Sequence, residues 1–184
     1  MRSVPLSLFL VCALVACGKP PIEPRWAAGV PRSTITVTSA SFGDGSRIPV
    51  DHTCDGKELM PPLVLSAPPE GTKSLVVTVE DPDTPNGTLT HMIVFNVAPD
   101  TTKLAGGADL GGGGEAARFG LNAWENARYA GPCPPKGEVH RYRYRVIALN
   151  TMLKLPEGAP RGQIDEAMDT HIIGEGMLTG HFGH

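Results

Sequence analysis

The chain has 184 residues, with 16 lysines and arginines against 19 aspartates and glutamates, and its formal net charge is −3. That balance lacks the concentrated basic face that nucleic-acid binding requires, so we expect no nucleic-acid partner. Glycine contributes 22 residues and proline 18. So many helix breakers disfavour a helical bundle and favour short strands joined by turns. At this length, one domain with a single core is the default.

The N-terminus has the pattern of a secretion signal. Arg2 precedes an apolar run over residues 4–16, which is shorter than the roughly 20 residues that a membrane-spanning helix needs. The run ends in Leu-Val-Ala-Cys17, which resembles a bacterial lipobox. In such proteins the signal peptidase cuts before the cysteine, which then carries acyl chains that anchor it firmly. The alternative is a secreted protein in which Cys17 has no role.

These features predict a lipoprotein of the cell envelope. We expect residues 1–16 to be a signal peptide and residues 17–33 to be a lipidated N-terminus followed by a proline-rich tether. The membrane partner is then reached through the lipid on Cys17, and the protein lies in the bacterial cell envelope. Gly18 follows the cysteine in place of the aspartate that often retains such proteins at the inner membrane, which favours the outer membrane.

The predicted location limits which cysteines remain free to form a disulfide. Cys12 leaves with the signal peptide and Cys17 carries lipid, so Cys54 and Cys133 remain of the four cysteines. Two thiols in an oxidising compartment often pair as a disulfide. Two buried free thiols are the alternative. The sequence leaves this choice open.

Residues 34–184 have the pattern of a β domain. Residues 34–38 alternate with the period of two that a half-buried strand shows, and residues 139–150 do so strongly. Residues 74–80 and 91–97 are apolar and rich in β-branched side chains, as central strands are. One apolar stripe at helical spacing comes late, and it consists of Ile164, Ala167, Met168, His171 and Ile172. The glycine-rich segment 105–114 has no period and predicts a mobile loop.

Three segments contain unusual groupings of chemically active residues. The first is Thr53-Cys54-Asp55-Gly56 followed by a Pro-Pro pair, and the second is Glu80-Asp81-Pro-Asp83-Thr-Pro85 with His91 downstream. The third is Tyr-Ala-Gly-Pro-Cys133-Pro134-Pro135-Lys-Gly, followed by His140-Arg-Tyr142. The prolines stiffen the two turns before any ligand arrives, which lowers the ordering entropy lost on binding.

In this order the segments resemble those of the phosphatidylethanolamine-binding protein (PEBP) family, in its bacterial Raf-kinase-inhibitor-like branch. The resemblance runs from about residue 35 to residue 182. It implies a mainly β fold, namely a two-sheet antiparallel β-sandwich with one or two small helices, and a small anion pocket at one end. The family's analogous loop also suggests a cis bond between Thr84 and Pro85.

The resemblance implies a set of ligand-binding residues. They are Asp81, Asp83, Pro85, His91, Pro134, Pro135, His140 and Tyr142. We expect one aspartate to hydrogen-bond a histidine and raise its pKa, so that an imidazolium meets the anion. For Asp83, the alternative to ligand binding is a purely structural role in its own turn. The family often has a bulky aromatic residue where this chain has Leu89, and bacterial relatives usually have glycine where it has Glu125.

The sequence therefore predicts a non-catalytic binding protein for a small phosphate-bearing anion or a phospholipid head group. An inhibitor or modulator of a partner protein is the alternative, because the resemblance implies that as well. A hydrolase using Asp81 and His140 lacks an evident nucleophile, since no G-x-S-x-G motif occurs. The histidines and cysteines lack the spacing of a zinc motif, so we expect neither a metal nor a cofactor.

Overall fold

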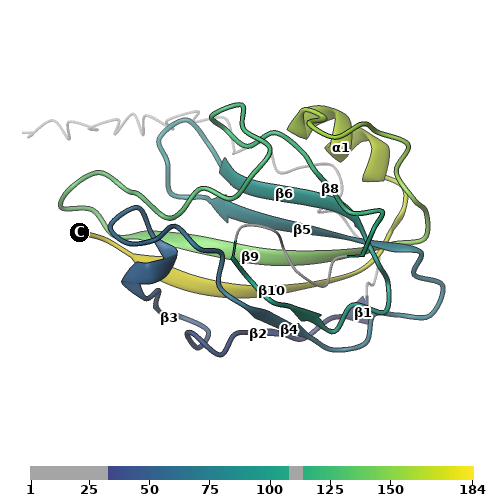
Figure 1. Ribbon diagram of the computed structural model, residues 1–184, viewed down its shortest axis with the longest axis horizontal. Helices are drawn as coiled ribbons and strands as arrows, with labels where there is room; N and C mark the ends of the chain where they lie inside the picture. The colour runs from purple at the N-terminus through teal and green to yellow at the C-terminus, as the bar shows by residue number, and fades with distance from the viewer. Residues whose placement is uncertain (1–32, 108–113) are drawn as a thin grey trace, which may run out of the picture.

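The computed structural model describes residues 33–107 and 114–184, and these fold into two β-sheets with one short α-helix (Figure 1). The larger sheet has the strand order β1-β10-β9-β5-β6-β8, with β3 beside β10. Its strands are β1 (Ser33–Thr34), β3 (Ser46–Arg47), β5 (Ser74–Asp81), β6 (Leu89–Val97), β8 (Arg118–Phe119), β9 (His140–Leu149) and β10 (Ile172–Phe182). The four strands β10, β9, β5 and β6 are antiparallel neighbours, and the short strands β1 and β3 pair with β10 in parallel.

The smaller sheet has the order β2-β4-β7 and packs on one face of the larger one (Figure 1). Its strands are β2 (Val37–Thr38), β4 (Leu63–Leu65) and β7 (Lys103–Leu104). The main core lies between the two sheets, where Val77 and Tyr144 of the larger sheet meet Leu65 and Leu104 of the smaller. The predicted two-sheet, mainly β architecture is therefore confirmed.

A second core lies on the opposite face of the larger sheet. The helix α1 (Arg161–Met168) covers this face and packs Ile164 and Met168 against Ile93 and Phe95 of β6. Strand β5 is consequently buried on both faces, which explains its continuous run of β-branched residues. The 3-10 helix η2 (Val50–His52) is the other short helix of the described residues.

Two sequence predictions about element boundaries were wrong. Residues 34–38 do not form one strand, because the chain passes from the larger sheet at Thr34 to the smaller sheet at Val37. The apolar stripe that predicted a helix as far as Ile172 ends earlier, at Met168. Ile172 instead begins β10 and pairs with Leu149, because sheet pairing outweighs the weak helical preference of this stretch.

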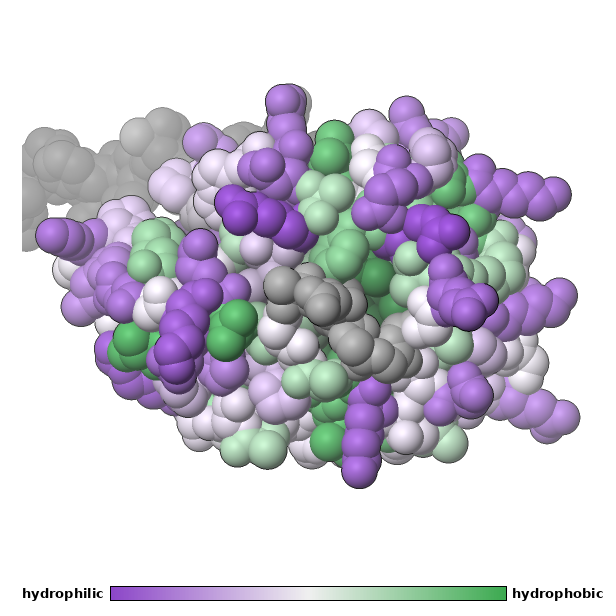
Figure 2. Space-filling view, viewed as in Figure 1, coloured by the Kyte–Doolittle hydropathy of each residue, from purple (hydrophilic) through white to green (hydrophobic). Residues whose placement is uncertain are grey.

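Turns and surface complete the described part of the chain. All of its peptide bonds are trans, so the prediction of a cis bond between Thr84 and Pro85 was wrong. No helix in residues 33–107 and 114–184 is long and apolar enough to cross a membrane. The face seen in Figure 2 is polar around its outline, with apolar side chains in separate small patches. The predicted signal peptide, the lipidation site Cys17 and most of the predicted tether and glycine-rich loop lie outside the described residues.

Candidate functional site

The site is built around a buried pair of side chains from neighbouring strands. Strand β5 ends at Asp81 and the antiparallel strand β9 begins at His140, so the two residues meet at the same end of the sheet. His140 Nδ1 lies 2.8 Å from Asp81 Oδ2, and both side chains are buried. The other oxygen of Asp81 accepts a hydrogen bond from the backbone N–H of Asp83 at 2.9 Å. Two segments 59 residues apart are thereby joined.

A second carboxylate completes the surroundings of His140. Glu138 Oε2 lies 3.0 Å from His140 Nε2, so each ring nitrogen faces a carboxylate. Burial alone lowers the pKa of His140, but the hydrogen bonds to Asp81 and Glu138 outweigh it and raise the pKa above 6.5. The imidazolium therefore contributes positive charge to the site, while both of its N–H groups are already donated to carboxylates.

His91 reaches the same site because strand β6 contains a β-bulge. The register shifts between Val79 and Glu80 of β5, which leaves His91 as an extra residue between the partners Met92 and Thr90. Strict alternation would place His91 on the α1 face with Ile93. The bulge turns it to the other face, where its ring meets the Tyr142 ring edge-on at 5.3 Å.

His91 is buried and carries one unused nitrogen. Its Nδ1–H donates to the carbonyl oxygen of Ala130 at 2.9 Å, and a carbonyl can only accept, so Nε2 carries a lone pair. Burial lowers the pKa of His91, although the bond to Ala130 opposes the shift, and the ring is neutral at pH 7. Nε2 is buried and has no hydrogen-bond partner among the described residues. Of the two predicted site histidines, His91 thus presents an acceptor, and His140 is the expected imidazolium.

Tyr142 presents a donor beside that acceptor. Its side chain is fully buried, and its hydroxyl makes no hydrogen bond within 3.5 Å in the described part of the chain. Burial raises the pKa of Tyr142, and the nearby Asp81 carboxylate raises it further, whereas the nearby backbone of Cys133 lowers it; the net shift is upward, so the phenol keeps its proton. Buried polar atoms without partners are rare in native proteins, and two of them lie here on rings in contact.

An aromatic side chain walls the site even though Leu89 is not aromatic. Trp124 packs edge-on against His91 with ring centroids 5.1 Å apart, and it comes from a loop distant in the sequence. Asn122 folds that loop, because its Oδ1 accepts from the backbone N–H of Trp124 and of Asn126, both at 3.0 Å. Glu125 in the same loop has φ +59°, a conformation that favours glycine. This backbone conformation explains why the family usually has glycine at this position.

The remaining predicted site residues differ in their contacts and burial. Asp83 is held by Arg141, whose backbone N–H and guanidinium both donate to its carboxylate. That side-chain bond to Arg141 lowers the pKa of Asp83 to about 2, although partial burial opposes the shift. This arrangement fits the structural alternative for Asp83. Pro134 is buried, whereas Pro85 and Pro135 are exposed on their turns.

A cavity of about 260 Å³ lies next to the buried cluster. Ala130 connects the two, since it lines the cavity and accepts the hydrogen bond from His91. The cavity is lined by Cys54, Glu58, Asn122, Trp124, Asn126, Arg128, Ala130, Gly131 and Cys133. Cys54 and Cys133 form a disulfide across its wall, with their Cα atoms 5.5 Å apart. The choice left open by the sequence is thereby decided in favour of pairing.

Sequence reasoning missed Glu138 and Trp124. Glu138 had a usable signal, because residues two apart along an extended chain share a side and Glu138 precedes His140 by two. Trp124 had none, since its contact with His91 depends on the path of a loop. The structure does bring together Asp81, His91, His140 and Tyr142 as predicted.

Comparison with known proteins identifies the family of the chain. Residues 38–183 match the family described as "Phosphatidylethanolamine-binding protein". A UPF0098 protein of Methanothermobacter thermautotrophicus is 42% identical over 141 residues, which cover 76% of this chain and 93% of the relative. A protein of Mycobacterium tuberculosis named "Putative lipoprotein LppC" is 35% identical over 191 residues, covering 95% of this chain and 92% of the relative.

A solved structure has the same fold. The crystal structure of E. coli YbcL, described as a member of the PEBP family, superposes with a TM-score of 0.75 at 29% identity. The match covers 82% of this chain and 98% of YbcL. The family match over most of the chain, the relatives and the two-sheet fold agree, and the chain belongs to the phosphatidylethanolamine-binding protein family, in the bacterial and archaeal branch that contains YbcL and the UPF0098 proteins.

Proposed function

We propose that the protein is an envelope-anchored, non-catalytic binding protein whose site takes a small phosphate-bearing anion or a phospholipid head group. One observation carries the proposal. His91 Nε2 and the Tyr142 hydroxyl are buried on two rings in edge-on contact, and neither atom has a hydrogen-bond partner within 3.5 Å in the described residues. An unpaired buried polar group costs about 1–3 kcal/mol, and a ligand that pairs both groups recovers that cost.

The two groups call for a ligand with both kinds of hydrogen-bonding partner. The Tyr142 hydroxyl can donate to a phosphate oxygen, and His91 Nε2 can accept from an ammonium or hydroxyl group. The charged His140 offsets one of the two negative charges of Asp81 and Glu138. The polar side chains of the adjoining cavity, including Asn126 and Arg128, suit the rest of a head group better than an acyl chain.

The non-catalytic assignment is supported by what His140 contacts. In a hydrolase, an aspartate–histidine pair orients the second ring nitrogen toward a hydroxyl or thiol nucleophile. Here that nitrogen faces the carboxylate of Glu138 at 3.0 Å. A carboxylate in this place stabilises the imidazolium and supplies no nucleophile for the pair to activate. Failure of the protein to release phosphate or fatty acid from phospholipids supports the assignment, and His140-dependent release contradicts it.

The envelope location is supported by the lipobox pattern ending at Cys17 and by the likeness to a relative that is named as a lipoprotein. Labelling cells with a radioactive fatty acid tests it. We expect the wild-type chain to incorporate the label and Cys17→Ser to lose it. Equal labelling of the two chains contradicts the anchor.

The binding site is tested with glycerophosphorylethanolamine, a soluble head-group phosphodiester, by calorimetry. We expect Tyr142→Phe to lower the affinity by about tenfold, because a hydrogen bond to a charged group contributes about 1.5–3 kcal/mol. Tyr144→Phe is the matched control, since Tyr144 lies on the same strand and face and its hydroxyl is 3.4 Å from that of Tyr129. Equal affinities of the two variants contradict the proposed site.

A further inference from the structure

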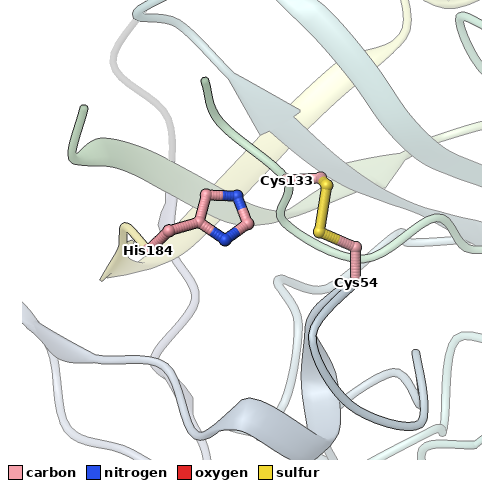
Figure 3. Close-up of side chains that lie close together, drawn as sticks. All are labelled: Cys54, Cys133 and His184. Atoms are coloured by element: carbon pink, nitrogen blue, oxygen red, sulfur yellow. A yellow bond between two sulfur atoms is a disulfide. The ribbon is translucent and has the colours of Figure 1, made fainter. Parts of the chain in front are cut away.

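Three side chains capable of binding a metal ion lie together and are not members of the buried cluster of Asp81, His91, His140 and Tyr142, although two of them, Cys54 and Cys133, line the adjoining cavity. Cys54 follows η2, Cys133 precedes the Pro-Pro turn, and His184 follows β10 (Figure 3). The two sulfur atoms and one ring nitrogen of His184 all lie within 4.8 Å of one another. Cysteine and histidine are the ligands preferred by Zn²⁺ and similar ions, but sulfurs joined in a disulfide are not available as thiolates.

His184 is held in place by groups that suit a metal ligand. Its Nδ1 lies 3.0 Å from Asp55 Oδ2, and its Nε2 donates to the carbonyl oxygen of Pro134 at 2.9 Å. Histidines that bind metal ions usually donate their other ring N–H to a carboxylate or a backbone carbonyl. Either contact of His184 can serve that purpose once the other nitrogen turns to a metal.

The two cysteine-bearing segments are held together by contacts other than the disulfide. The backbone N–H of Cys54 donates to the carbonyl oxygen of Pro132 at 3.1 Å. Gly131 packs so closely that a Cβ added to it would lie 2.9 Å from the backbone of Thr53. The two sulfurs therefore stay near each other when the bond between them is broken.

The disulfide is also accessible to a small reductant. Both cysteines line the 260 Å³ cavity, and Cys133 is exposed. A small dithiol can reach the sulfurs by this route, whereas a disulfide in the core could not be attacked without unfolding.

We propose that reduction of the Cys54–Cys133 disulfide converts this cluster into a binding site for a thiolate-seeking divalent metal ion such as Zn²⁺, with Cys54, Cys133 and His184 as its protein ligands. A dithiol supplies two electrons and two protons, and it leaves as a cyclic disulfide while Cys54 and Cys133 become thiols. Metal binding then displaces the two thiol protons. Water takes the fourth tetrahedral position, as in zinc sites with three protein ligands.

The experiment uses the full chain with Cys12→Ser and Cys17→Ser, so that Cys54 and Cys133 are the only cysteines. The protein is reduced anaerobically with dithiothreitol, freed of reductant and titrated with Co²⁺, a spectroscopic probe for tetrahedral zinc sites. We expect one Co²⁺ per chain, with thiolate charge-transfer absorption in the near ultraviolet and tetrahedral bands in the visible. The oxidised protein should show neither feature.

Variants assign the ligands. We expect His184→Ala to weaken Co²⁺ binding by about tenfold or more, and Asp55→Asn to weaken it less. The matched control is His171→Ala, which removes a half-buried histidine whose ring contacts Asn150 at 2.8 Å. Near-ultraviolet circular dichroism follows the fold of each reduced sample.

Three results would overturn the proposal. The first is a reduced protein that shows no thiolate-to-Co²⁺ absorption, whether it stays folded or unfolds. The second is equal Co²⁺ binding by the oxidised and reduced forms, because the sulfurs would then not be ligands. The third is equal affinity of His184→Ala and His171→Ala for Co²⁺, which would remove the histidine from the site.

Discussion

Glu80 and Asp81 are adjacent at the end of strand β5, and their buried carboxylates lie on opposite faces of the larger sheet. Glu80 faces the α1 side, where Arg161 lies 2.9 Å and Arg145 3.5 Å from its oxygens. Asp81 faces the space between the sheets, where it pairs with His140 at 2.8 Å. Both carboxylates are paired, but their surroundings differ.

The difference lies in what surrounds each pair. Around Glu80 the charges continue into further ion pairs, since Arg161 also binds Asp165 at 2.7 Å and Arg145 also binds Glu175 at 3.2 Å. Around Asp81, two rings with unpartnered polar atoms lie close by, those of His91 and Tyr142. A cluster in which charge meets charge serves to join the helix to the sheet. Thr78 Oγ1 and Glu80 Oε1 on the α1 side also have no hydrogen-bond partner in the described residues, but Arg161 pairs with Glu80 Oε1 at 2.9 Å. On the Asp81 side the unpartnered atoms belong to two rings next to a cavity, which is the arrangement that a ligand would use.

The largest expected effect is a loss of stability when the Glu80 cluster is broken. Glu80→Gln removes the charge between two arginines, and breaking such a buried ion pair costs about 3 kcal/mol or more of unfolding free energy. Urea denaturation measures the loss. Affinity for glycerophosphorylethanolamine should stay within about twofold of wild type. A variant as stable as wild type would show that the Glu80 cluster is not what joins α1 to the sheet.

Substitution of the neighbouring Asp81 should reduce ligand affinity more than stability. Asp81→Asn weakens the hold on His140, so we expect affinity for glycerophosphorylethanolamine to fall by more than tenfold, while stability falls by only about 1–2 kcal/mol. Calorimetry and urea denaturation of the same samples give both values. If Asp81→Asn and Glu80→Gln reduce affinity equally, the contrast between the two faces fails.

The pH dependence sharpens the contrast within the Asp81 cluster. The folded-state pKa of His140 is raised, so its stabilising contribution is full below about pH 6.5, its unfolded value, and is lost as the pH rises through the folded value. The pKa of His91 is lowered by burial, so its contribution is present above pH 6.5 and is lost as the pH falls. The two histidines therefore act with opposite signs.

We expect the difference in unfolding free energy between wild type and His140→Asn to shrink from pH 6 to 8.5, and that between wild type and His91→Asn to shrink below pH 6.5. Binding should weaken about five- to tenfold from pH 6 to 8.5, as the His140 charge is lost. Glycerophosphorylethanolamine suits this test because its phosphodiester keeps one charge throughout. Affinity that does not change over this range would remove the imidazolium from binding.

The smallest expected effect concerns the loop that carries Trp124. Glu125→Gly relieves a left-handed backbone conformation at φ +59° and should raise stability by about 0.5–1 kcal/mol, without changing affinity. Glu125→Ala is the matched control, because it keeps the Cβ and should leave stability unchanged. Thermal unfolding measures both. Equal melting temperatures of the two variants would show that the backbone conformation carries no measurable strain.

Much of the fold could be predicted from local pattern. The alternation over residues 139–150 correctly placed His140 and Tyr142 on one face, because side chains of a strand point to its two faces in turn. The boundaries around Thr34 and Ile172 could not be predicted, because each depends on which distant strand offers hydrogen-bond partners. The ion pair of Arg145 could not be predicted either, because its partner Glu80 lies on a neighbouring strand.

The sequence by itself determined the β architecture, the family and the residue types of the site, because hydrophobic period, proline placement and motif order are local properties of the chain. Only the tertiary structure decided how those residues act. A single bulge in β6 turns His91 from the helix side to the side of Tyr142, and a loop far along the chain supplies Trp124. Which carboxylates reach His140, and hence the direction of its pKa shift, depends likewise on chain segments brought together by folding.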